Sequence, residues 1–234
     1  YNSLVWTKAG SEIYFDPDYS NVSPGFRFGF PTIEPIYFDV AKSKFAYLMV
    51  TPSGSRIEFR ETSVSNIYET ADSSYTQLET TGASNPNDPV ENITITVRTT
   101  DGTQMKYEWK DGAFKCTRIK DRNGNYITIA YDAYGLLQSV TDTLGRVITV
   151  NYDNEQYPTS ITQTWKNSNG SGSNVTRTWA SFTYMNMDDA GGRPAFDTNF
   201  SNLTSVGPPD GMALKVLQKI SYLDGTSTKF DYNT

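Results

Sequence analysis

The sequence is poorest in the residues on which most enzymes and metal sites depend. Its 234 residues include no histidine and one cysteine, Cys116. Without histidine, His-dependent catalytic triads and histidine-ligated zinc sites are excluded. One cysteine cannot form an internal disulfide or a thiolate cluster, and its alternation with Phe114 predicts a buried thiol. We therefore expect no catalytic residues, no metal and no cofactor.

Positive charge and long apolar runs are also scarce. The chain has 20 Lys and Arg against 26 Asp and Glu, a formal net charge of −6. A non-specific nucleic-acid binder gains its affinity from many contacts between Lys or Arg and phosphates, so we expect no nucleic-acid partner. No stretch approaches the roughly 18 apolar residues that a membrane helix needs, so we expect no membrane insertion.

What the chain does have is a series of short alternating segments between turns rich in Gly, Asp and Asn. Tyr, Ile, Val, Thr and Phe alternate with polar residues at 92–99, 104–109, 126–131 and 146–152. This pattern predicts an all-β fold of antiparallel hairpins. Only residues 212–220 fit a short amphipathic helix as well as a strand. Long loops are expected at residues 80–91, 166–174 and 188–209.

An internal repeat is the clearest feature. The interval from Gly124 to Gly145, like that from Tyr131 to Tyr152, is 21 residues. The frame recurs in weaker form around three more glycines, with an apolar residue five positions before each one. Large or β-branched residues mostly follow at the third, fifth and seventh positions. The weaker copies are centred on Gly54, Gly102 and Gly225.

The repeat has a direct physical meaning. A period of two places the three large residues on one face of a strand, where they form an apolar stripe. The glycine before each strand permits a tight turn. A single hairpin cannot bury its own stripe, so neighbouring units must cover it. We therefore expect a curved strip of antiparallel hairpins.

The same residues resemble the YD repeats of RHS proteins, a family that includes bacterial RHS and wall-associated proteins, toxin-complex cocoon subunits and teneurins. The resemblance is most specific over residues 119–153 and is weaker at residues 219–233. Residues 24–31, Pro-Gly-Phe-Arg-Phe-Gly-Phe-Pro, resemble the segment that precedes the repeats. The positions that carry the repeat are Gly124, Tyr131, Asp132, Gly135, Asp142, Gly145, Arg146, Tyr152 and Asp153.

This resemblance implies a fold and a role. In the family, such repeats wind a β-sheet into a shell that encloses a toxin or effector domain or forms an extracellular body. The repeats are not catalytic. The expected partners are therefore the rest of the same polypeptide and a cell-surface receptor, and the expected location is secreted or at the cell surface. We divide the chain into an N-terminal β segment, residues 1–90, and repeats, residues 91–234, as one continuous unit of a larger protein. No glycine follows Tyr152-Asp153 at the expected place, which predicts a longer hairpin there.

Aromatic residues make up 14% of the chain and favour an alternative function, a stand-alone carbohydrate-binding or adhesion module. The spacing places Trp109 on the core stripe. Trp165 and Trp179 flank the 166–174 loop, and we expect them to face each other across one hairpin as a platform for a cell-surface glycan.

Two further alternatives are weaker. A glycoside hydrolase needs paired carboxylates, and the acidic pairs Asp16/Asp18 and Asp188/Asp189 are more typical of turns. The stretch at residues 121–125 has the first half of a calcium loop, but it lacks the bidentate glutamate, so we expect it to be a hairpin turn.

Overall fold

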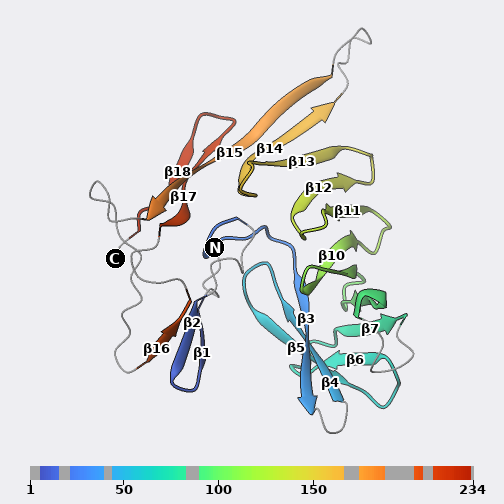
Figure 1. The fold of residues 1–234 in the computed structure, drawn as a ribbon. Helices are drawn as coiled ribbons and strands as arrows, with labels where there is room; N and C mark the ends of the chain where they lie inside the picture. The colour runs from blue at the N-terminus through green and yellow to red at the C-terminus, as the bar shows by residue number, and fades with distance from the viewer. Residues whose placement is uncertain are drawn as a thin grey trace. The chain divides into compact units, whose positions relative to one another are not determined.

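The computed structural model describes residues 6–15, 22–39, 44–82, 90–165, 174–187, 203–207 and 213–232 (Figure 1). In this part of the chain all regular structure is β-strand apart from one turn of 3-10 helix at Val90–Asn92. The all-β prediction is confirmed. No helix in the described segments is long and apolar enough to cross a membrane. The chain forms two compact units, Gly29–Ile148 and the pair of segments Tyr1–Phe28 and Thr149–Thr234.

Eight strands of the unit Gly29–Ile148 close into an antiparallel barrel. Each strand pairs with the next one in the sequence, and the last pairs with the first (Figure 1). The strands are β3 (Thr32–Asp39), β4 (Lys44–Val50), β5 (Arg56–Glu61), β6 (Ile67–Thr70), β7 (Gln77–Thr81), β8 (Thr94–Arg98), β9 (Gln104–Lys110) and β10 (Ala113–Lys120). The pairing of β3 with β10 joins the two edge strands and closes the ring.

Large side chains meet across the inside of this barrel. The Tyr47 ring on β4 packs edge-on against Tyr68 on β6 at 4.8 Å and against Phe114 on β10 at 6.3 Å. The Tyr107 hydroxyl on β9 donates a hydrogen bond to Met49 Sδ on β4 at 3.4 Å. None of these pairs joins neighbouring strands, so the contacts run through the interior. An eight-stranded barrel is just wide enough for side chains to fill in this way.

The predicted apolar stripe is confirmed at its centre and is weaker at its ends. The fifth residue after the turn glycine is buried in four copies of the frame, as Phe59, Tyr107, Ile129 and Val150. The third and seventh residues are mostly half-buried, and Ile148 is 38% exposed. The central residue of each strand therefore contributes the most apolar burial.

Strand β10 is shared between the barrel and the hairpins that follow it. Its first half, at Phe114 and Lys115, pairs with β3, while Arg118 to Lys120 pair with β11 (Tyr126–Tyr131). A β-bulge in its pairing with β9 separates the two halves. Strand β12 (Leu137–Asp142) then pairs with β11. Both later strands are thus bonded outside the ring, which the sequence did not lead us to expect.

The second unit contains two groups of strands. Strands β1 (Trp6–Ala9) and β2 (Glu12–Phe15) form a hairpin, and β16 (Thr204–Val206) pairs with β2 in parallel. The prediction of a continuous loop at residues 188–209 is therefore wrong at residues 204–206, because β2 offers backbone hydrogen bonds to this short segment. In the other group, β14 (Pro158–Trp165), β15 (Val175–Met187), β17 (Leu214–Tyr222) and β18 (Ser227–Lys229) pair antiparallel in that order.

The strand bounds resolve one further expectation. Residues 214–220, part of the ambiguous segment 212–220, are strand β17 and not helix. The division that we drew at residues 90 and 91 marks where clear repeats begin, but it does not separate compact units. Residue 90 lies within Gly29–Ile148 because the ring joins β3 to β7 with β8 to β10. Strand β13 (Val147–Tyr152) begins in one unit and ends in the other.

Candidate functional site

One tight hairpin turn recurs seven times in the described part of the chain. In each, the backbone N–H of the fourth residue donates to the carbonyl of the first, and the N–H of the first donates to the carbonyl of the fifth. The fourth residue always has a positive φ, between 67° and 93°. All five glycines of the predicted frame hold this position. The fourth residues are Gly54, Gly102, Gly124, Gly135, Gly145, Gln156 and Gly225.

An aspartate opens four of these turns and binds them in the same way. Its Oδ1 accepts hydrogen bonds from the backbone N–H groups of the third and fifth residues, at 2.8–3.0 Å. Its Oδ2 accepts one bond from a side chain that differs from turn to turn. The pairs are Asp121 with Asn125, Asp132 with Gln138, Asp142 with Arg146, and Asp153 with Lys215.

At Asp121 and Asp142 these hydrogen bonds favour the ionised carboxylate. The side-chain amide of Asn125 lowers the pKa of Asp121, with help from the turn's backbone N–H groups. The backbone N–H of Arg146 and then its guanidinium lower the pKa of Asp142. Because both oxygens of Asp121 accept hydrogen bonds from its own turn, its role here is to hold the turn closed.

The turn after Tyr152-Asp153 keeps the form of the others although it lacks glycine, and the strands that follow it are longer: β14 has eight residues and β15 has 13, against six in β13. Gln156 takes the place of the missing glycine with φ of 67°, and the turn has the same two backbone hydrogen bonds as the others. A non-glycine residue in this region is strained, so the turn is held by its other contacts. Asp153 provides them through the N–H groups of Glu155 and Tyr157.

Lys215 is a further support of this turn that the sequence analysis missed. Its ammonium lies 3.1 Å from Asp153 Oδ2 and 2.6 Å from Glu155 Oε2. The same nitrogen sits 4.2 Å from the centre of the Tyr157 ring. Although burial alone would lower the pKa of Lys215, hydrogen bonds to the two carboxylates raise it. This lysine ties strand β17 to a turn 60 residues earlier in the chain, and no local pattern marks it.

The two repeat tyrosines, Tyr131 and Tyr152, are both partly buried. Tyr131 is half-buried, and its hydroxyl donates to the Cys116 carbonyl at 3.2 Å. Tyr152, the equivalent residue in the next copy, is half-buried as well. Cys116 itself is fully buried, as expected, and burial raises the pKa of its thiol to about 12.

A buried lysine explains why Gly135 is glycine. Lys115 is only 8% exposed, and its ammonium donates to the Gly135 carbonyl at 2.7 Å. Burial lowers the pKa of Lys115, and the carboxylates of Asp111 and Asp132 oppose that effect. A Cβ atom on Gly135 would collide with this ammonium and lie 2.9 Å from the Asp111 Cβ. The glycine is therefore needed for space as well as for backbone conformation.

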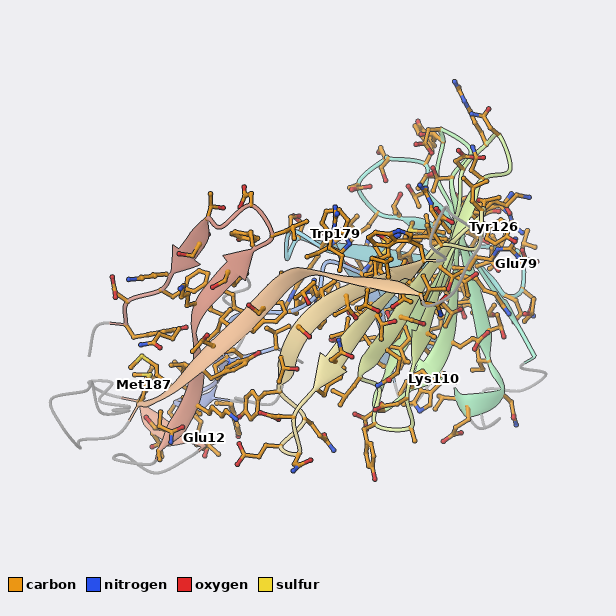
Figure 2. All side chains as sticks on the ribbon, turned by 90° about the horizontal axis from the view of Figure 1, so that it is seen from above. Glu12, Glu79, Lys110, Tyr126, Trp179 and Met187 are labelled. Carbon is orange, nitrogen blue, oxygen red and sulfur yellow. The ribbon has the colours of Figure 1, made fainter. Side chains whose placement is uncertain are left out.

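A different kind of surface lies on the β14–β15 hairpin. Trp165 pairs with Val175, and Gln163 pairs with Arg177, so these four side chains share one face of the hairpin. Trp179 has no strand partner on β14, because a β-bulge separates the Ile161–Ala180 pair from the Thr162–Thr178 pair. Bulges commonly re-aim a side chain in this way. Figure 2 shows Trp179 on β15, well away from Met187 at the far end of the strand.

The expectation that Trp165 and Trp179 face each other directly is corrected by this register. Instead, Arg177 joins them: its guanidinium carbon lies 5.4 Å from the Trp165 ring centre and 5.9 Å from the Trp179 ring centre. The Trp179 indole N–H donates to Gln163 Oε1 at 3.1 Å. We call Gln163, Trp165, Val175, Arg177 and Trp179 the Trp–Arg face.

The Trp–Arg face is exposed to solvent. Trp165 is 37% exposed and Trp179 is 41% exposed. Trp109 differs from both, because it is half-buried and packs edge-on against Phe114 at 5.1 Å. The signal for Arg177 in the sequence is its alternation with Val175 and Trp179.

In the described segments carboxylates gather in pairs, such as Asp153 and Glu155 around Lys215. No three carboxylate or thiol groups gather in these segments in a way that could hold a metal ion. Asp16, Asp18, Asp188 and Asp189 lie outside the described residues, as do residues 166–173 of the predicted loop.

Comparison with models of protein families finds none that matches the chain, and comparison with curated proteins finds no similar sequence. The resemblance to YD repeats therefore depends on the repeat residues of the sequence alone.

Proposed function

We propose that this chain is a non-enzymatic structural segment of an RHS/YD-repeat protein, secreted or at the cell surface. In this role it contributes part of a β-shell that encloses a toxin or effector domain or forms an extracellular body. Its partner is the rest of the same polypeptide.

The observation that carries this proposal is the recurrence of one aspartate-capped turn. Asp121, Asp132, Asp142 and Asp153 each bind two backbone N–H groups through Oδ1, at nearly equal distances. A catalytic carboxylate needs a free oxygen near a substrate, whereas each of these has partners on both oxygens. Identical turns at regular spacing are what a scaffold of added hairpins requires.

The 21-residue period also agrees with such a scaffold. Within Gly29–Ile148, strands β11 and β12 separate the Gly124 and Gly145 turns, so both turns lie at the same end of the strands. The backbone N–H of Tyr126, next to the first turn, donates to Thr143 Oγ1 in the second at 2.7 Å, and that hydroxyl donates back to the Tyr126 carbonyl at 2.9 Å. Successive copies thus contact one another through their turns.

The size of the native gene product tests the proposal. An antibody raised against this chain is used to probe source cells and culture medium. A band several times larger than the chain's own 26.2 kDa, or a ladder processed from one, is expected. A single band near that mass would contradict a shell segment, because one such chain has too few hairpins to enclose another domain.

A second candidate function is carbohydrate binding, and the exposure of Trp165 and Trp179 specifically favours it. Large aromatic side chains are normally used to fill a core or an interface. Two exposed indoles on one hairpin face offer flat apolar surfaces on which sugar rings can stack. Loss of glycan binding in Trp165→Ala or Trp179→Ala, with unchanged thermal unfolding, would support this function.

A further inference from the structure

We propose that the Trp–Arg face binds a carboxylated sugar, such as a uronic or sialic acid residue of a cell-surface glycan. This inference rests on the second candidate function and names its ligand class. It follows from the charge, the geometry and the surroundings of Arg177.

Arg177 is the one charged residue of the two strands that form the hairpin. Strands β14 and β15 together contain 21 residues, and all the others are apolar, hydroxyl or amide residues. This single positive charge lies in a chain whose net charge is −6. Within the described segments, no carboxylate forms an ion pair with it. The face is therefore locally positive, and it complements an anion.

The position of the Arg177 guanidinium near the two rings leaves its N–H groups able to bind that anion. A guanidinium that stacks on an aromatic ring uses its flat face, while its N–H groups point outward within the plane. Those N–H groups match a carboxylate, which accepts two parallel hydrogen bonds from an arginine. Because the guanidinium carbon of Arg177 is near both indoles, a carboxylate bound there would hold its own sugar ring beside Trp165 or Trp179.

The neighbouring side chains strengthen this arrangement. Gln163 receives the Trp179 indole N–H, which holds that ring in place before any ligand arrives. Its amide nitrogen remains a donor that can reach a sugar hydroxyl. A neutral sugar would use the rings and the amide but not the charge, so acidity is the property that this face selects.

The test uses the full chain and isothermal titration at physiological salt with three acidic oligosaccharides. These are a galacturonate hexamer, a mannuronate hexamer and sialyllactose, and each is paired with its neutral methyl ester. We expect at least one acid to bind about tenfold more tightly than its ester, because a hydrogen bond to a charged group is that strong. Arg177→Gln should abolish the preference, and Trp165→Ala or Trp179→Ala should abolish binding.

Arg118→Gln is the matched control. The Arg118 guanidinium also lies over an aromatic ring, 4.2 Å from the centre of the Tyr126 ring, but among the described residues no second ring forms such a contact with it. This variant should bind like the native chain. An equal loss in Arg118→Gln and Arg177→Gln would overturn the proposal, because net charge alone would then explain binding.

The outcomes distinguish the preference for acidic sugars from glycan binding itself. Equal binding of acids and esters, unaffected by Arg177→Gln, would overturn the acidic preference and keep the glycan function. Absence of binding to all six sugars would overturn both.

Discussion

Replacement of Gly135 by alanine tests whether the turn glycines serve only the backbone or also the packing. Gly135 and Gly145 have similar φ values, 70° and 76°. Their surroundings differ, because a Cβ at Gly145 meets nothing within 4 Å, while one at Gly135 collides with the Lys115 ammonium. Both glycines belong to Gly29–Ile148, so the two variants report on the same unit.

The expected losses of stability differ accordingly. Alanine in the left-handed region costs about 1–2 kcal/mol, and its smaller entropy in the unfolded chain offsets about 0.4–1 kcal/mol of that. We therefore expect Gly145→Ala to lower the free energy of unfolding by about 1 kcal/mol. In Gly135→Ala, Lys115 must also move away from its carbonyl partner, and loss of a charged hydrogen bond adds about 1.5–3 kcal/mol. The total should be about 3 kcal/mol.

Urea unfolding of both variants measures this difference. Lys115→Met, alone and combined with Gly135→Ala, completes a double-mutant cycle, and we expect a coupling of about 1–2 kcal/mol between the two positions. Equal losses in Gly135→Ala and Gly145→Ala, or no coupling with Lys115→Met, would refute the argument that Lys115 makes glycine necessary at this turn.

Three more predictions follow from the turns and the core. Gln156→Gly should raise the free energy of unfolding by about 0.5–1 kcal/mol, because it relieves the left-handed strain, whereas Asn154→Gly in the same turn should give no gain in urea unfolding. The pKa of Asp142 is lowered on folding by the backbone N–H and guanidinium of Arg146, so its contribution is present above the unfolded pKa of about 4 and is lost as the pH falls through the folded value. Asp142→Asn should therefore be less stable than the native chain at pH 7, and a difference in stability that does not shrink as the pH falls below about 4 would contradict this. Iodoacetamide at pH 8, close to the pKa of a free thiol, should leave Cys116 unmodified in the folded chain and modify it fully in urea, and rapid labelling without urea would argue against the buried thiol.

Local structure was the part that the sequence predicted best. The strand expected at residues 126–131 matches β11, and the one expected at 146–152 differs from β13 by one residue. Turn glycines and alternating apolar residues act over a few positions, so their effect can be read directly along the chain. The same reasoning failed at Gln156, because only the structure reveals that a non-glycine residue has been forced into the left-handed region.

Long-range pairing was beyond the reach of the pattern. A period of two shows which face of a strand is buried, but it does not name the strand's partner. The barrel closes through only two residue pairs between β3 and β10, Ile33 with Phe114 and Thr32 with Lys115, about 80 positions apart. No repeat, glycine or charge marks these positions as partners. The Lys215 contacts with Asp153 and Glu155 were missed for the same reason.

The division of β10 explains how one sequence pattern can produce both a ring and a hairpin series. The stripe residues of the barrel and of the later hairpins obey the same spacing after the turn glycine, as Tyr107 and Ile129 illustrate, so the pattern alone does not distinguish them. The length of strand β10 distinguishes the barrel from the later hairpins. Strand β10 has eight residues, whereas its pairing with β3 involves only Phe114 and Lys115, so Arg118 to Lys120 are left to pair with β11. Shortening β10 beyond Cys116 would remove the template for β11 while leaving both closing pairs, and the barrel and the hairpins would then become separable.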